Sequence, residues 1–201
     1  MNCSYPLKDI LSSGLPSKLA IFLAIACVAG VWCLLYALNA WLFSYFNFSK
    51  NFISWVFLPA IVRLLAVLLV GWAGVLGLFL GAMFTALFTS GFEHSLLVVL
   101  CFALLSAAGP LLAVMLCVWG LKLKTRLHGL TAMNLVILSM VSALFIAIPH
   151  NLAFYFFGLT SNFLDGIGPM FMGDLVGTII TLYLVRLLIP KTMDTAEPSF
   201  S

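Results

Sequence analysis

Long apolar runs separated by short polar segments set the pattern of this chain. A membrane-spanning helix needs about 20 mostly apolar residues, so each run is a candidate span. The pattern predicts an all-α, polytopic membrane helix bundle with six transmembrane helices. The runs cover residues 19–46, 52–70, 74–88, 96–119, 130–157 and 169–189.

The length of the chain leaves room for one membrane domain. Residues 1–18 and 191–201 are mixed in character and are expected to form cytoplasmic tails, whereas residues 19–190 form the six-helix domain. A soluble domain of typical size needs about 100 residues or more, and the polar connections are far shorter than that. We therefore expect a single domain embedded in the membrane.

Composition supports the same class of protein. Hydrophobic residues make up 64% of the chain and charged residues 7%, whereas a soluble domain carries about 25% charged residues. The mean hydropathy is +1.23. The net charge of +3 comes mainly from short connections beside helices, so it predicts no nucleic-acid partner.

Basic residues in these connections predict the orientation. Multi-pass membrane proteins concentrate Lys and Arg in their cytoplasmic loops. With the amino terminus inside, the opposite loops hold only Lys50, beside Glu93 and Asp165. Both termini are therefore expected in the cytoplasm. The basic residues then placed inside are Lys8, Lys18, Lys122, Lys124, Arg126, Arg186 and Lys191.

Polar residues inside the apolar runs are the candidate functional site. Arg63 is set deep in the second run, and Asp174, His150 and Asn151 lie at similar depth in later runs. A charged residue at the centre of a span costs roughly 2.5–3.5 kcal/mol on insertion scales. Arg63 and Asp174 are therefore predicted to pair inside the bundle, with His150 and Asn151 nearby. The cluster is a ligand-binding pocket, a purely structural fixture, or a site of catalysis or proton transfer.

Small residues and a proline are predicted to shape helix packing. Glycine lets a second helix backbone approach closely, and proline removes a backbone donor and kinks a helix. A tight turn is expected from Gly71 to Gly74, and a kink at Pro59. The packing positions are Pro59, Gly71, Gly74, Gly77, Gly81, Gly173 and Gly177.

Sequence motifs for catalysis and metal binding are missing from the chain. It has no G-x-S-x-G, H-E-x-x-H or phosphate-loop motif. Its cysteines lack the C-x-x-C spacing of metal and redox sites. We therefore expect no catalytic residues, no metal site and no cofactor, and hence no enzyme.

Two motif regions carry a family resemblance. Residues 58–65 (LPAIVRLL), with Gly71 and residues 77–82 (GLFLGA), are similar to the hairpin of MASE1 domains, and residues 172–178 (MGDLVGT) resemble that family's late G-D-x-x-G helix. Ile61 stands where the family often has glycine. The matching positions are Pro59, Gly81, Gly173, Asp174 and Gly177.

MASE1 domains are bacterial membrane input domains that precede histidine kinases and cyclic-dinucleotide enzymes. The resemblance implies a multi-pass sensory or binding module in the bacterial inner (plasma) membrane, although such domains commonly have more helices. The sequence shows no output domain. Signal transduction would thus need a separate membrane or signalling protein as partner, and a small-molecule ligand would be the input.

Transport is the alternative. A six-helix bundle of this length is also similar in layout to the substrate-capture subunits of vitamin importers, which bind a small molecule near the outer face and dock on an energising subunit. A structural or assembly subunit is a third reading of the same pattern.

Overall fold

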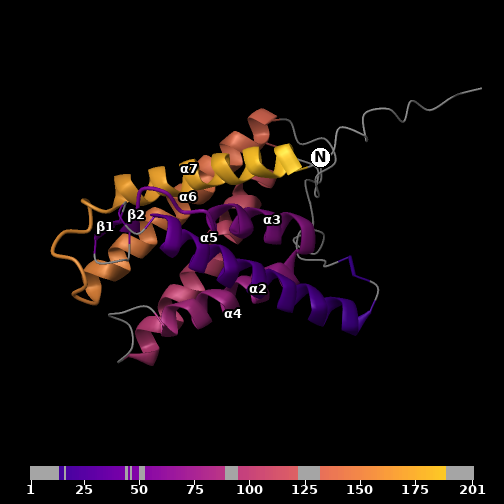
Figure 1. Cartoon of the computed structure of the whole chain (residues 1–201), viewed down its shortest axis with the longest axis horizontal. Helices are drawn as coiled ribbons and strands as arrows, with labels where there is room; N and C mark the ends of the chain where they lie inside the picture. The colour runs from indigo at the N-terminus through magenta and orange to yellow at the C-terminus, as the bar shows by residue number, and fades with distance from the viewer. Residues whose placement is uncertain are drawn as a thin grey trace, which may run out of the picture.

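The fold is a bundle of helices that run roughly alongside one another (Figure 1). The computed structural model describes residues 14–15, 17–43, 45, 47–49, 53–88, 95–121 and 132–188. Most of the predicted amino-terminal tail and all of the predicted carboxy-terminal tail lie outside these residues. The helices are α2 (Lys18–Phe43), α3 (Ala60–Val70), α4 (Trp72–Leu87), α5 (Leu96–Leu121), α6 (Ala132–Phe156) and α7 (Ile167–Leu188).

Four of the described helices, namely α2, α5, α6 and α7, are long and apolar enough to cross a membrane. The other two are shorter, with 11 residues in α3 and 16 in α4. At 1.5 Å per residue they extend about 16 and 24 Å, against a hydrocarbon core of about 30 Å. The prediction of a membrane helix bundle is confirmed in this form.

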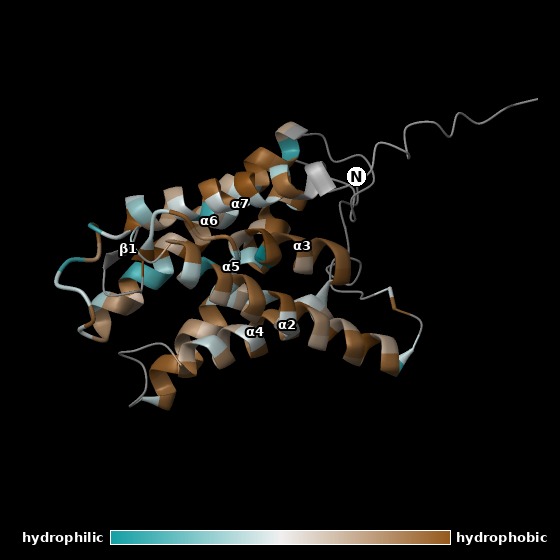
Figure 2. Ribbon diagram, viewed as in Figure 1, coloured by the Kyte–Doolittle hydropathy of each residue, from teal (hydrophilic) through white to brown (hydrophobic). Residues whose placement is uncertain are grey.

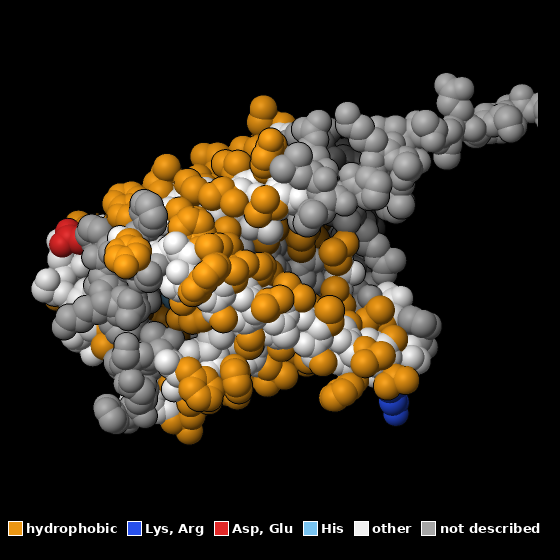
Figure 3. Space-filling view, viewed as in Figure 1, with side chains coloured by type: hydrophobic (Ala, Val, Ile, Leu, Met, Phe, Trp, Pro, Cys, Tyr) orange, Lys and Arg blue, Asp and Glu red, His pale blue; other side chains and the backbone are white. Residues whose placement is uncertain are grey.

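Apolar side chains cover the outside of the bundle. The helices are mostly brown in Figure 2, and orange side chains cover the flanks in Figure 3. Leu34, Leu80 and Leu104 are among the large apolar residues exposed on α2, α4 and α5. In water such a surface would be an aggregation hazard, whereas in a bilayer it is the face that meets lipid.

The prediction of a helix over residues 52–70 is wrong for its first half. Helix α3 begins at Ala60, and residues 54–59, called the strap below, are not helical. Pro59 therefore does not kink a helix but precedes its first residue, with φ −63° and ψ −12°. Proline disfavours helical geometry in the residue before it and suits the start of a helix, which explains the boundary.

The strap continues from a short antiparallel pairing of β1 (Asn47–Ser49) with β2 (Ile53–Ser54), and Ser54 belongs to both β2 and the strap. Two of its backbone donors are satisfied by neighbouring helices, as burial in a membrane requires, and the Val56 N–H donates to Ser54 Oγ within the strap. The Phe57 N–H donates to the Gly173 carbonyl oxygen at 3.0 Å. The Leu58 N–H donates to Asn39 Oδ1 at 2.9 Å. The strap therefore bridges α2 and α7.

Glycines on α7 make room for the strap. A Cβ atom at Gly173 would collide with the Ser54 carbonyl oxygen, and one at Gly177 would collide with the Phe57 carbonyl oxygen. The sequence predicted that these glycines admit another helix, but they admit extended backbone instead. The close approach is needed because the Phe57 N–H must reach a carbonyl of α7.

The glycines of α4 serve two purposes. Gly77 and Gly81 face Val28 and Trp32 of α2, so they bring two helices together as predicted. The turn predicted from Gly71 to Gly74 is shorter than expected. Only Gly71, with φ 60°, leaves the helical conformation. Gly74 already lies within α4, against the Ala66 backbone of α3.

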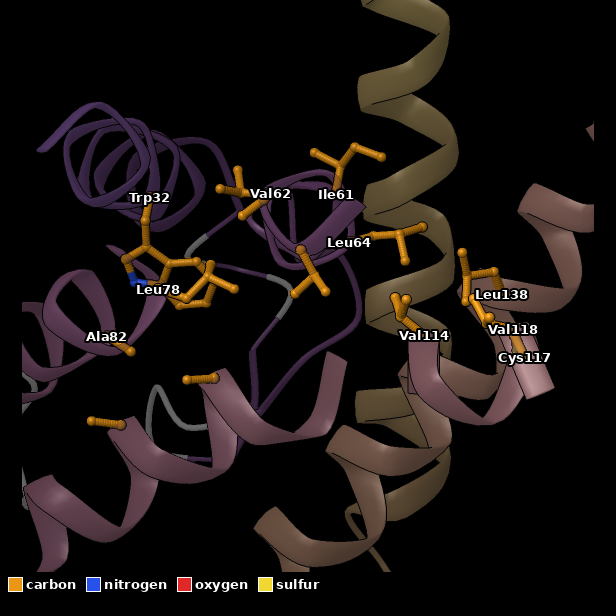
Figure 4. Close-up of a cluster of buried hydrophobic side chains, with 14 residues drawn as sticks. Trp32, Ile61, Val62, Leu64, Leu78, Ala82, Val114, Cys117, Val118 and Leu138 are labelled. Atoms are coloured by element: carbon orange, nitrogen blue, oxygen red, sulfur yellow. The ribbon is translucent and has the colours of Figure 1, made fainter. Parts of the chain in front are cut away.

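Helix α3 lies at the centre of the bundle. It packs against α2, α4, α5, α6 and α7, while α2 packs on α4 and α7 packs on α6. Figure 4 shows the apolar cluster around it, in which Leu64 of α3 lies near Val114 of α5 and Trp32 of α2 lies near Leu78 of α4. A short helix enclosed in this way places its polar residue, Arg63, inside the protein.

The glycine contacts of α7 give a stability prediction. Gly177→Ala should destabilise the protein by about 1–3 kcal/mol, because the added methyl group forces the strap from α7. Thermal unfolding of the detergent-purified protein measures the effect. Gly168→Ala on the same helix is the matched control, since its Cβ meets nothing within 4 Å. Equal melting temperatures for the two variants would contradict the described strap.

Candidate functional site

Arg63 of α3 and Asp174 of α7 form an ion pair inside the bundle. Arg63 Nη1 donates to Asp174 Oδ2 at 2.8 Å, and each residue is 5% exposed. Asp174 follows Ile167, the first residue of α7, by seven positions, or about 10 Å along the helix axis. The structure thus brings together the two opposite charges that the sequence predicted to pair.

Two aromatic rings lie over the Arg63 guanidinium. The Cζ atom is 5.1 Å from the ring centroid of Trp32 on α2 and 4.9 Å from that of Phe57 in the strap. The two rings meet edge to face, with centroids 5.9 Å apart. A desolvated cation over an aromatic face gains about 2 kcal/mol or more. The rings therefore stabilise the charge alongside Asp174.

Neither ring was among the site residues predicted from the sequence. A signal for Trp32 did exist, because it lies in the middle of an apolar run while Trp41, Trp55, Trp72 and Trp119 lie near the ends of theirs. Tryptophan favours the membrane–water interface, so a central one suggests a buried partner for its ring or its N–H. Phe57 carried no such signal in a chain with 18 phenylalanines.

The indole ring of Trp32 is held in place by a second polar contact. Its Nε1–H donates to Thr85 Oγ1 of α4 at 3.1 Å. The Thr85 hydroxyl lies 3.1 Å from the carbonyl oxygens of Gly81 and Ala82, one turn earlier in α4. A hydroxyl that donates along its own helix leaves a lone pair for the indole. Helices α2, α3, α4 and α7 are thereby linked through one set of contacts.

His150 lies between α5 and α6 and has partners of its own. Its Nδ1 is 2.9 Å from the Ile146 carbonyl oxygen and its Nε2 is 3.2 Å from Ser106 Oγ. A carbonyl oxygen only accepts, so Nδ1 carries a proton, and in the neutral ring Nε2 accepts from Ser106. No hydrogen bond joins His150 to Arg63 or Asp174 among the described residues.

Asn151 secures the start of α7. Its Nδ2 donates to the Ala147 carbonyl oxygen at 2.8 Å and approaches Met170 Sδ at 3.6 Å. The side-chain oxygen is buried against Gly166, without a hydrogen-bond partner in the described part of the chain. Asn151 thus packs the turn before α7 and does not share hydrogen bonds with the ion pair.

The four predicted site residues therefore divide into two groups. Arg63 and Asp174 share one centre, to which the structure adds Trp32 and Phe57. His150 and Asn151 hold α6 against α5 and α7. No group of three His, Cys, Asp or Glu side chains suited to a metal ion occurs among the described residues. We call Arg63, Asp174, Trp32 and Phe57 the arginine centre.

Comparisons with known proteins place the chain in no family. No protein-family model, no curated protein and no solved structure matches it.

A double-mutant cycle tests the energetic coupling of the ion pair. Arg63→Ala and Asp174→Ala should each lower the free energy of unfolding by about 3–5 kcal/mol, because each leaves an unpaired buried charge. The double variant should lose less than the sum, with a coupling of about 0.5–3 kcal/mol. Reversible unfolding in detergent gives the values. Strictly additive losses would contradict the pairing.

The contribution of the Trp32 ring can be separated from that of its N–H. Trp32→Phe keeps an aromatic face over Arg63 and removes the donor to Thr85, so it should cost about 1 kcal/mol. Trp32→Leu also removes the cation–π contact and should cost about 2 kcal/mol more. Trp119→Phe, at a residue 77% exposed, is the control. Equal losses for the two Trp32 variants would show that the ring face contributes nothing.

Proposed function

We propose that this chain is a multi-pass inner-membrane binding module whose recognition site is the arginine centre. One observation carries the proposal: a buried Arg–Asp pair lies directly beside the non-helical strap. Ionisable residues inside membrane domains are costly, and they commonly mark ligand or ion sites. Non-helical backbone at membrane depth is likewise tolerated only inside protein or beside a cavity. Together they favour recognition over mere packing.

We propose that the chain crosses the membrane six times, with both termini in the cytoplasm. In this arrangement the strap and α3 make one crossing together and α4 returns after Gly71. The end of the bundle that carries Gly71 would face the cytoplasm, and the end that carries Asp165 would face outward. The clustering of Lys and Arg in the predicted inner connections supports this orientation.

As a binding module, the chain would act through a separate protein. The MASE1-like motifs favour a sensor in the bacterial inner membrane. The strap could transmit a signal, because it carries Phe57 of the recognition site and also bridges α2 and α7. A ligand that binds unequally to two strap positions would shift these helices. A signalling protein that contacts them would then detect the ligand.

Small-molecule capture for transport is a second candidate, favoured by the strap itself. Non-helical segments beside membrane helices line the substrate sites of many transporters, and the strap before α3 is non-helical backbone of this kind. In this case the partner would be an energising membrane subunit. Both candidates place the ligand at the same centre.

A binding screen tests the proposal. The purified protein is heated with a panel of vitamins, small anions, amines and neutral metabolites, and co-purifying membrane proteins are identified by native mass spectrometry. We expect at least one ligand or partner to bind the wild type; a ligand at 100 times its Kd should add about 2.7 kcal/mol of stability. Arg63→Lys should lose that binding, and Asn162→Ala in an exposed loop should keep it. Binding that Arg63→Lys leaves unchanged would contradict the proposal.

A further inference from the structure

One edge of the Arg63 guanidinium has no hydrogen-bond partner among the described residues. The group's only hydrogen bond within the described structure leaves from Nη1 to Asp174, and Nε is buried without a partner. The Cζ atom lies over the rings of Trp32 and Phe57, whose planes are inclined at 66° to each other, so neither ring supplies a hydrogen-bond acceptor to the remaining N–H groups. The N–H groups of Nε and Nη2 point the same way along this edge. Two parallel donors at this spacing match the two oxygens of a carboxylate.

The charge of the centre restricts what can bind at this edge. Arg63 and Asp174 are formally neutral as a pair, and the surrounding helices are apolar. An anion that arrived alone would leave one uncompensated charge inside the membrane, at a cost of several kcal/mol. A carboxylate therefore needs to bring a positive charge with it, and the smallest one is a proton.

We propose that the arginine centre binds a small carboxylic acid, taken up as a carboxylate together with one proton. This inference rests on the proposed function and names its ligand class. The carboxylate accepts hydrogen bonds from Nε and Nη2 of Arg63. The proton is held between the ligand and Asp174, which retains its contact with Nη1. The occupied centre then holds one guanidinium, one carboxylate and one carboxylic acid, and it stays neutral.

The surroundings indicate the rest of the ligand. Trp32 and Phe57 flank the guanidinium, and Tyr36 of α2 meets Phe57 edge to face, with ring centroids 6.3 Å apart. The surroundings of the guanidinium are thus aromatic, and α3 and α7 add apolar side chains. Aromatic or otherwise apolar acids fit such a site better than polyhydroxylated ones, because each buried hydroxyl would need a partner of its own.

Few other titratable groups lie around Asp174. Helix α7 packs against α6, α3 and β2; of their buried titratable residues, α3 contributes Arg63 and α6 contributes His150. Tyr155 of α6 and Tyr183 of α7 are exposed on the outside of the bundle. The ring nitrogens of His150 are engaged by Ser106 and Ile146. Tyr36 on α2 is the next such group, beside Phe57. The proton taken up with the ligand is therefore assigned to the ligand–Asp174 pair.

Equilibrium binding of radiolabelled benzoate to the detergent-purified full chain tests this assignment. Between about pH 5.5 and about pH 7.5 benzoate stays ionised, so uptake of one proton should raise its Kd about tenfold per pH unit. Benzamide has the same ring without the charge, and benzylamine carries the opposite charge. Each should compete at least tenfold more weakly than unlabelled benzoate.

Three variants locate the proton. Asp174→Asn leaves Arg63 as the only charge, so benzoate should bind without a proton and its Kd should no longer depend on pH. His150→Gln should keep the wild-type slope. Arg63→Lys lacks the two-donor edge and should weaken binding more than tenfold. If Asp174→Asn does not fold, the inference is tested by the change of the wild-type benzoate Kd with pH and by the competition with benzamide.

Several outcomes would overturn the inference. They are a pH-independent Kd in the wild type, a slope that persists in Asp174→Asn or vanishes in His150→Gln, equal competition by benzamide, and failure of benzoate, phenylacetate and acetate to bind. If carboxylates fail while another compound in the wider screen binds through Arg63, the ligand class is wrong and the proposed function stands. If nothing binds through Arg63, both fail.

Discussion

A buried positive charge that must be neutralised within an apolar bundle is the constraint on which this structure depends. Arg63 lies on the most enclosed helix, α3, and its charge is met by Asp174 from α7. The rings of Trp32 and Phe57 supply further electrostatic stabilisation from α2 and the strap. Lipid provides no hydrophobic force that would press helices together. Polar contacts of this kind therefore contribute an unusual share of the specificity of the packing.

The strap shows how the same constraint acts on the backbone. Every amide at membrane depth needs an internal partner, and a helix normally supplies it. Residues 54–59 donate no helical hydrogen bonds. The Phe57 N–H donates instead to the Gly173 carbonyl oxygen of α7, and the Leu58 N–H donates to the Asn39 side chain of α2. The glycines of α7 are the steric condition for this arrangement. A non-helical segment is thus stabilised by contacts from two helices, α2 and α7.

These two features meet at Phe57, which belongs to the strap and covers the guanidinium. Whatever displaces the strap also uncovers Arg63, and whatever alters the charge of the pair alters one face of the strap. The charged centre and the non-helical segment are thus coupled through one residue. The His150–Ser106 contact, by contrast, joins only α5 to α6 and serves to orient them.

The sequence by itself determined the membrane class and most of the helices, because apolar composition and span length are local properties that lipid enforces directly. It also determined that Arg63 and Asp174 should meet, because opposite charges at similar depth have few other partners. The tertiary structure alone decided that the helix before Ala60 is replaced by the strap, and that α7 glycines face it. The tertiary structure also determines that the rings of Trp32 and Phe57 lie against Arg63. The strap and the two ring contacts depend on which segments pack against each other across the bundle. The hydrophobic pattern of a single segment carries no information about its packing partner.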